Sequence, residues 1–96
     1  MLVTTATLHW SAELGAAVLV ADGLETLDAD QTYQLWLVRG ETPLPAGVFD
    51  PDSGEAIAEL EGEMHAGDII AVTVEQAGGS STGLPTSDPI FAIPTA

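Results

Sequence analysis

The chain has 96 residues, of which 46% are hydrophobic, so its length and apolar content suit one domain with one hydrophobic core at residues 1–96. Fifteen Asp and Glu residues against a single Arg give a formal net charge of −14, which would repel nucleic-acid phosphates and anionic lipids, so we expect no nucleic-acid partner. Because the chain has no cysteine, disulfides, thiolate zinc sites and iron–sulfur clusters are excluded.

Short segments of strand-like composition recur along the chain between clusters of Gly, Pro, Asp and Ser, a pattern typical of all-β proteins. In chain order, the predicted strands cover residues 3–10, 16–21, 32–38, 46–49, 56–64, 69–75 and 89–94. Seven such strands predict an antiparallel β-sandwich, and we expect an immunoglobulin-like Greek key. The proline-containing segment 41–45 is predicted to be a loop, and segment 50–54 a turn.

The type of the fifth segment, 56–64, has to be decided between two signals. It contains good helix formers, and intrinsic propensity alone favours a helix. The sequence nevertheless alternates apolar or small residues with Glu59, Glu61 and Glu63. A period of two places these carboxylates in water and their neighbours inside, so we predict a strand. The last segment, 89–94, has a proline at each end and is predicted to lie at a sheet edge.

The core is expected to be built mainly from large residues of the predicted strands. They are Leu19, Tyr33, Leu35, Trp36, Phe49, Leu60, Ile70, Val72, Val74 and Phe91. Trp36 is interpreted as a core anchor that fills the space between the sheets, because a large ring with one polar group usually does so in a small sandwich. The alternative is an exposed tryptophan that stacks on a ligand.

No segment is predicted to enter a membrane. The longest apolar stretches, 16–21 and 69–74, are far shorter than the roughly 20 residues that a spanning helix needs. Residues 1–5 have neither the basic nor the apolar region of a signal peptide. If the domain is exported, another part of its parent protein must carry it.

Two oxygen-rich or glycine-rich segments resemble binding loops only superficially. The turn Gly78-Gly79-Ser80 lacks the spacing, the lysine and the following helix of a phosphate-binding loop. Segment 50–55 lacks the bidentate glutamate of an EF-hand calcium loop. His9 and His65 share no metal-binding spacing. We therefore predict no metal and no cofactor.

Catalysis is not expected from this sequence. Glu59, Glu61 and Glu63 project from one strand face into solvent, where nothing would shift their pKa values or form a cleft. Ser80 has no nucleophile-elbow context. Glu75 stands at the end of an apolar strand and is interpreted as a hydrogen-bond acceptor for a nearby backbone or as an ion-pair partner of Arg39.

Several motifs occur in an order that resembles a known family. They are Gly23-Leu24, Tyr33-Gln34-Leu35-Trp36, Gly47-Val48-Phe49, Val72-Thr73-Val74-Glu75, Gly78-Gly79-Ser80 and Pro85-Thr86. In these motifs the chain resembles the C-terminal, extracytoplasmic domain of bacterial anti-sigma-K factors. It departs from the family at Gln76, where a proline is usual, and at residues 81–84, which lengthen the loop before Pro85.

The resemblance implies a regulatory rather than an enzymatic role. It implies a domain on the periplasmic or cell-surface side, tethered to the inner membrane through the full-length parent, which controls sigma-factor-dependent transcription through regulated proteolysis. The expected partner is a protein or a protease that acts on the parent, and the domain is expected to be a monomer. The motif residues that would carry structure or interaction are Tyr33, Trp36, Glu75, Gly78, Gly79, Ser80, Pro85 and Thr86. The alternative is a free-standing extracellular binding or adhesion module, calcium-dependent or not.

Overall fold

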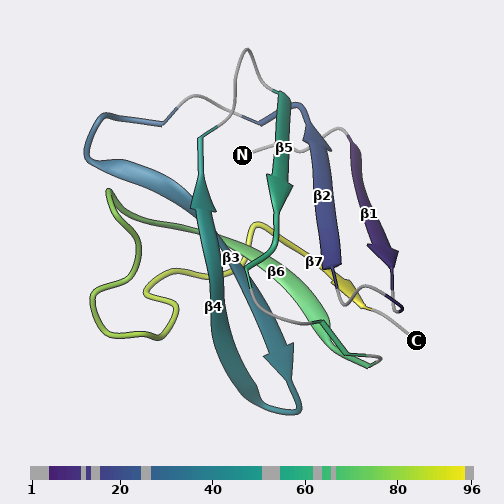
Figure 1. Ribbon diagram of the computed structural model, residues 1–96. Helices are drawn as coiled ribbons and strands as arrows, with labels where there is room; N and C mark the ends of the chain where they lie inside the picture. The colour runs from purple at the N-terminus through teal and green to yellow at the C-terminus, as the bar shows by residue number, and fades with distance from the viewer. Residues whose placement is uncertain are drawn as a thin grey trace.

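The computed structural model describes residues 5–11, 13, 16–24, 27–50, 55–61, 64–65 and 67–94. These residues form seven strands and no helix, in two antiparallel sheets that pack face to face (Figure 1). The strands are β1 (Thr5–Ser11), β2 (Ala16–Asp22), β3 (Gln31–Arg39), β4 (Thr42–Phe49), β5 (Glu55–Glu59), β6 (Ile69–Gln76) and β7 (Phe91–Pro94). The predicted all-β antiparallel sandwich is therefore confirmed.

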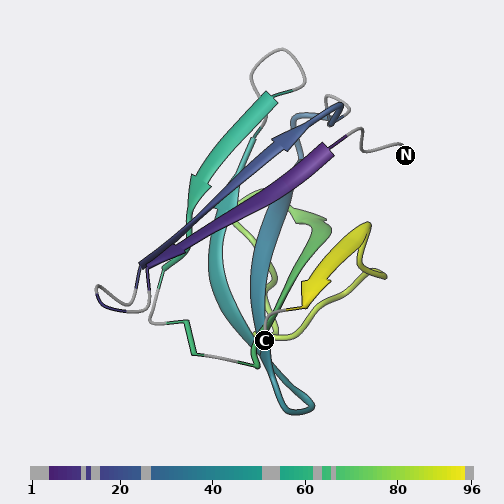
Figure 2. The same ribbon diagram turned by 90° about the vertical axis from the view of Figure 1, so that its right-hand side faces the viewer.

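The two sheets have the strand orders β1-β2-β5 and β4-β3-β6-β7. Figure 2 shows the three-stranded sheet as a separate layer that crosses over the strands of the larger one. Strands that follow each other in the chain pair within a sheet, as β1 does with β2 and β3 with β4. In addition, β5 returns to pair with β2, and β6 returns to pair with β3. The chain therefore crosses between the sheets repeatedly, so neither sheet is made of one continuous segment.

Strand β4 begins earlier than the sequence suggests. Residues 42–45, which we predicted to be loop because of their prolines, pair with β3, with Val38 opposite Pro43 and Trp36 opposite Pro45. The prediction was wrong because β4 is the edge strand of its sheet, and a proline without a backbone N–H is tolerated at an edge.

Strand β5 has the predicted type but ends at Glu59 instead of residue 64. Beyond it, the Leu60 amide donates to the carbonyl of Ala17 in the first sheet, at 2.9 Å. The Glu61 amide donates to the carbonyl of Ala46 in the second sheet, also at 2.9 Å. The chain thus leaves one sheet for the other at this point, while Gly62 and Glu63 lie outside the described residues. The expected edge position of the last strand, β7, is confirmed.

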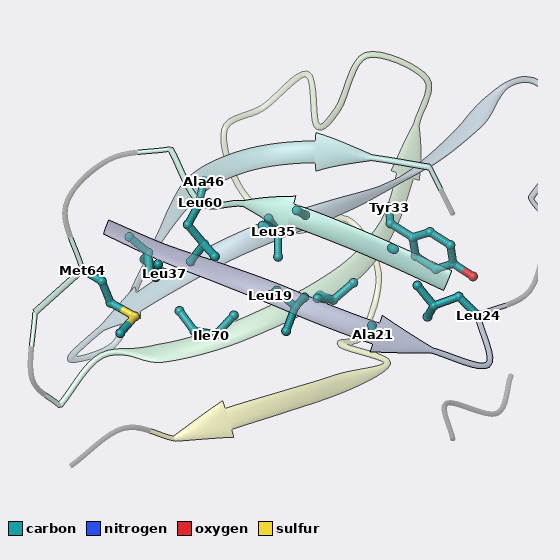
Figure 3. Packing of buried hydrophobic residues seen from close by; sticks show 14 residues of the cluster. Leu19, Ala21, Leu24, Tyr33, Leu35, Leu37, Ala46, Leu60, Met64 and Ile70 are labelled. Atoms are coloured by element: carbon teal, nitrogen blue, oxygen red, sulfur yellow. The ribbon is translucent and has the colours of Figure 1, made fainter. Parts of the chain in front are cut away.

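The main core lies between the two sheets (Figure 3). All the predicted core residues except Trp36 belong to this cluster or pack against it. Trp36 is fully buried, but it alternates with the core residues Leu35 and Leu37, so its side chain lies on the opposite face of the sheet. The expectation that Trp36 fills the space between the sheets was wrong. The core contributions missing from our expectation include Leu24, Leu37, Met64 and small alanines such as Ala21 and Ala46.

Among the described residues, no helix is long and apolar enough to cross a bilayer.

Truncation of Leu19 tests the main core. Its side chain is 1% exposed at the centre of β2, where it faces Leu8 on one side and Ala58 on the other. We expect Leu19→Ala to lower the free energy of unfolding in urea by about 2–5 kcal/mol, since the cavity cannot be refilled without moving both sheets. The matched control is Ile57→Ala on the neighbouring strand β5, where the side chain is 69% exposed and the change should be below about 0.5 kcal/mol. Similar losses for the two variants would contradict the assigned burial.

Candidate functional site

The outer face of the four-stranded sheet is buried, although it carries polar residues. Thr32, Gln34 and Trp36 of β3 lie there, beside Thr73 and Glu75 of β6, and all five are buried. The segment that covers this face is residues 77–90, the covering loop, which connects β6 to β7. Figure 1 shows it leaving the end of β6, extending past β4 and returning to β7. The protein therefore has a second, polar layer of packing outside the sandwich core.

A chain of hydrogen bonds joins the sheet to the covering loop, and we call it the Glu75 chain. The indole N–H of Trp36 donates to Oγ1 of Thr73 at 2.8 Å, and this hydroxyl donates to Oε2 of Glu75 at 2.6 Å. From the loop, the Thr86 hydroxyl donates to Oε1 of Glu75, and the Thr86 amide donates to the carboxylate at 3.1 Å. The carboxylate of Glu75 thus accepts hydrogen bonds from both layers.

Glu75 is only 3% exposed, and no cation lies beside it among the described residues. Its burial would raise the pKa of the carboxyl group, but the hydrogen bonds from Thr73 and Thr86 outweigh burial and hold the pKa below its ordinary value. The expected role as a hydrogen-bond acceptor is confirmed. The alternative, an ion pair with Arg39, is wrong.

Arg39 binds Asp68 instead. Its Nε and Nη2 donate to the two carboxylate oxygens at 3.0 and 2.8 Å, and the His65 amide adds a third hydrogen bond at 2.9 Å. The Arg39 hydrogen bond is the largest influence on the pKa of Asp68, which lies below its ordinary value although burial opposes the change. His65 lies in the turn before Asp68, as expected, because the Asp68 amide donates to its carbonyl.

The turn Gly78-Gly79-Ser80 docks onto β3 through a side chain. Gly78 and Gly79 have φ angles of 92° and 97°, which glycine adopts without steric cost. The Ser80 amide donates to Oε1 of Gln34 at 2.7 Å. A Cβ atom at Gly79 would lie 3.0 Å from Cγ1 of Val48 and 3.1 Å from Oε1 of Gln34, so only glycine fits without displacement. Gly79 is required for close packing and for its positive φ angle, and Gly78 only for its positive φ angle, so neither glycine needs a ligand to explain it.

Beside this turn lies an open depression of about 310 Å³. One wall is β4, with Pro45, Gly47 and Val48, and the other is the turn 78–80, with Gln34 between them. The carboxylate of Glu61 lies over Gly47: its Oε2 is 2.8 Å from the position that a Cβ of residue 47 would take. The depression therefore combines an amide, a carboxylate and an apolar wall.

The predicted motif residues fall into three separate places. Trp36, Glu75 and Thr86 join in the Glu75 chain, with Pro85 half-buried next to Thr86. Gly78, Gly79 and Ser80 border the depression. Tyr33 lies on the core side, where its ring stacks on Phe49 with centroids 5.5 Å apart.

Thr73, Gln34 and Glu61 are residues in or near these places that the sequence did not single out as site residues. Gln34 could have been found as an uncharged polar residue inside an otherwise apolar strand. Glu61 could not, because its place depends on the chain crossing between the sheets.

The other features considered for binding are not assembled into a site in the described part of the chain. There, no three His, Asp or Glu side chains gather closely enough to hold a metal ion. The segment 50–55, considered as a calcium loop, lies outside the described residues at 51–54, and its interpretation as a turn stays a prediction. Trp36 is 0% exposed and Trp10 half-buried, so neither presents a free ring for ligand stacking.

Comparison with known proteins adds the following. Residues 3–90 match the family model described as "Anti-sigma-K factor rskA, C-terminal". The chain is 35% identical over 89 residues, 92% of its length, to the anti-sigma-K factor RskA of Mycobacterium sp. strain KMS, and 32% identical over 89 residues to that of Mycolicibacterium vanbaalenii. It is also 35% identical over 74 residues, 77% of its length, to an uncharacterized protein in the phr 5' region of Streptomyces griseus.

The matched regions cover 30%, 35% and 36% of these three relatives, so the chain spans about a third of their length. No solved structure matches the chain.

Replacement of Glu75 by Gln tests the Glu75 chain. An amide nitrogen cannot accept a hydrogen bond, so either the Thr73 or the Thr86 donors lose their acceptor in a buried place. We expect Glu75→Gln to lower the free energy of unfolding by about 1–3 kcal/mol. Glu59→Gln, at an exposed position of β5, removes the same charge and is the control, with an expected change below about 0.5 kcal/mol. If both variants were as stable as the parent, the chain of hydrogen bonds would not hold the covering loop.

Acidification should remove the same contribution. The pKa of Glu75 is lower in the folded chain than its ordinary value of 4.5, so in this range the folded state binds fewer protons than the unfolded state. Its stabilising effect is complete above about pH 5 and is lost as the pH falls through the folded-state pKa. We therefore expect the difference in unfolding free energy between the parent and Glu75→Gln, measured at constant ionic strength, to shrink below about pH 5. A constant difference down to about pH 3 would contradict the assignment.

Proposed function

This chain belongs to the family of anti-sigma-K factor C-terminal domains, and on that basis we propose that it is the regulatory domain of a membrane-anchored anti-sigma factor. The domain lies outside the cytoplasm, on the periplasmic or cell-surface side. It controls sigma-factor-dependent transcription indirectly, while a different part of the parent protein binds the sigma factor. The observation that carries this proposal is the family match over residues 3–90, nearly the whole chain.

The proposed mechanism is a gate on proteolysis. Cleavage of the parent near the membrane releases its inhibitory segment, and the folded state of this domain, or a protein bound to it, decides whether the protease can act. Supporting this, the covering loop is tied to the outer face of the sheet through Glu75. The loop and the sandwich therefore form one body that can obstruct a protease while folded and stop doing so when unfolded.

The remaining parts of the proposal concern the domain itself. We propose that residues 1–96 act as one unit with an immunoglobulin-like Greek key, supported by the pairing of β5 with β2 and of β6 with β3. The role is regulatory and not catalytic, and the domain acts as a monomer, because the net charge of −14 opposes self-association.

The gate is tested in the full-length parent or in a fusion of this chain to the N-terminal and membrane-anchoring parts of an anti-sigma-K factor. We expect Leu19→Ala, which weakens the sandwich core, to change the amount of cleaved product on immunoblots and to change a sigma-dependent reporter in the same cells. The control is Ile57→Ala, at an exposed position, which should behave as the parent does. The proposal fails if core unfolding, verified on the isolated domain, leaves cleavage and reporter activity unchanged.

A further inference from the structure

The depression between β4 and the turn 78–80 is not used in the role proposed above. It brings together Gly47 and Val48, Gly79 and Ser80, and Gln34, from three segments that are far apart in the sequence. The close approach of Gly79 to Val48 and Gln34 explains part of this arrangement. It does not explain why the amide of Gln34 and the carboxylate of Glu61 both border the depression.

The amide of Gln34 is fixed in orientation. It is 5% exposed, and because the Ser80 amide can only donate a hydrogen bond, the atom 2.7 Å from it must be the oxygen Oε1. The Nε2 group then points away from Ser80, and its two N–H donors have no partner among the described residues. Among the described residues, Nε1 of Trp10 is the only side-chain N or O atom that is both fully enclosed and without a hydrogen-bond partner. Nε2 of Gln34, which has no partner there, is therefore not fully enclosed. Since Gln34 lines the depression, we take this group to be accessible from the depression.

The carboxylate of Glu61 provides the opposite chemistry on the rim. The backbone of Glu61 is fixed by its hydrogen bond to Ala46, and its side chain lies over Gly47. No hydrogen bond or ion pair of this carboxylate occurs among the described residues. A buried donor and an exposed anion thus border one depression, next to the exposed side chain of Val48.

We propose that this depression binds an arginine- or lysine-bearing segment of a partner protein. The cationic group pairs with Glu61, a backbone carbonyl of the same segment accepts from Nε2 of Gln34, and the aliphatic part of the side chain packs on Val48. The volume of about 310 Å³ is sufficient for such a side chain and its adjoining peptide group. The net charge of −14 attracts cationic segments toward the surface before they dock.

The cation cannot be a Lys or Arg side chain of this chain or of a second copy of it. Arg39 is the only such residue in the sequence, and it is held by two hydrogen bonds to Asp68. The cation therefore comes from outside these 96 residues, and we assign it to a partner protein. This inference goes beyond the proposed gate and does not rest on it, because binding is measured on the 96-residue chain without the parent, the protease or a membrane.

The test is an NMR titration of the 15N-labelled chain with Nα-acetyl-arginine methylamide, which carries one guanidinium and flanking carbonyls. We expect saturable shifts at the amides of Val48, Gly79 and Ser80, with a dissociation constant on the order of millimolar, as fits one exposed ion pair and one hydrogen bond. The matching citrulline compound has the same shape without the charge and should bind about fivefold more weakly. n-Propylguanidinium, which has the same single charge but no carbonyl, should also bind more weakly.

Two variants with the same change of charge separate this site from the acidic surface in general. Glu61→Gln should weaken arginine binding about fivefold, whereas Glu59→Gln, two residues away at an exposed position of β5, should leave it unchanged. Unchanged amide spectra elsewhere and unchanged thermal unfolding will show that both variants are folded.

The proposal is overturned by any of three results. They are no saturable shift at Val48, Gly79 and Ser80, equal effects of the two variants, or n-propylguanidinium binding as tightly as the arginine compound. The last would mean that Gln34 donates no hydrogen bond to a peptide carbonyl.

Discussion

A buried carboxylate without a cation has to be satisfied by hydrogen-bond donors, and the outer half of this protein depends on how Glu75 meets that requirement. One donor, Thr73, comes from the same strand and is itself oriented by Trp36. The others come from Thr86, eleven residues after Glu75, in a loop with no regular structure of its own. The hydrogen bonds from Thr86 satisfy the carboxylate and at the same time hold the loop against the sheet. A buried carboxylate without these donors would destabilise the folded state.

The strand types were predictable from local patterns, because alternation and β-branched runs reflect which face of a sheet is buried. The alternation around Glu59 identified β5 as a strand despite the helix-forming composition of the segment. The beginning of β4 was not predictable in the same way. Its prolines are acceptable only because the strand lies at an edge, and edge position is a property of the whole sheet.

The place of Trp36 shows a similar limit. Alternation correctly puts it opposite Leu35, but a sequence cannot say whether the outer face of a strand is wet or covered. The polar residues Gln34 and Thr73 on that face would ordinarily indicate solvent. They are buried because residues 77–90 fold back over them, and the length and composition of that loop contain no periodic signal. The family motifs include Glu75, Thr86 and the glycine turn. The hydrogen bonds that join Glu75 to Thr73, and the turn to Gln34, are visible only in the three-dimensional structure.

The position of β1 has a mechanical consequence. It is the first strand of the fold, it lies at the edge of the smaller sheet, and β2 is its only strand neighbour there, through a ladder from Thr5 to Ser11. Tension applied to the chain ahead of Thr5 would therefore load this single ladder first. The covering loop and Glu75 belong to the other sheet, so β1 can be peeled away while they stay in place. In a protein tethered through the chain ahead of β1, force would therefore unfold this domain in stages, beginning with the separation of β1 from β2.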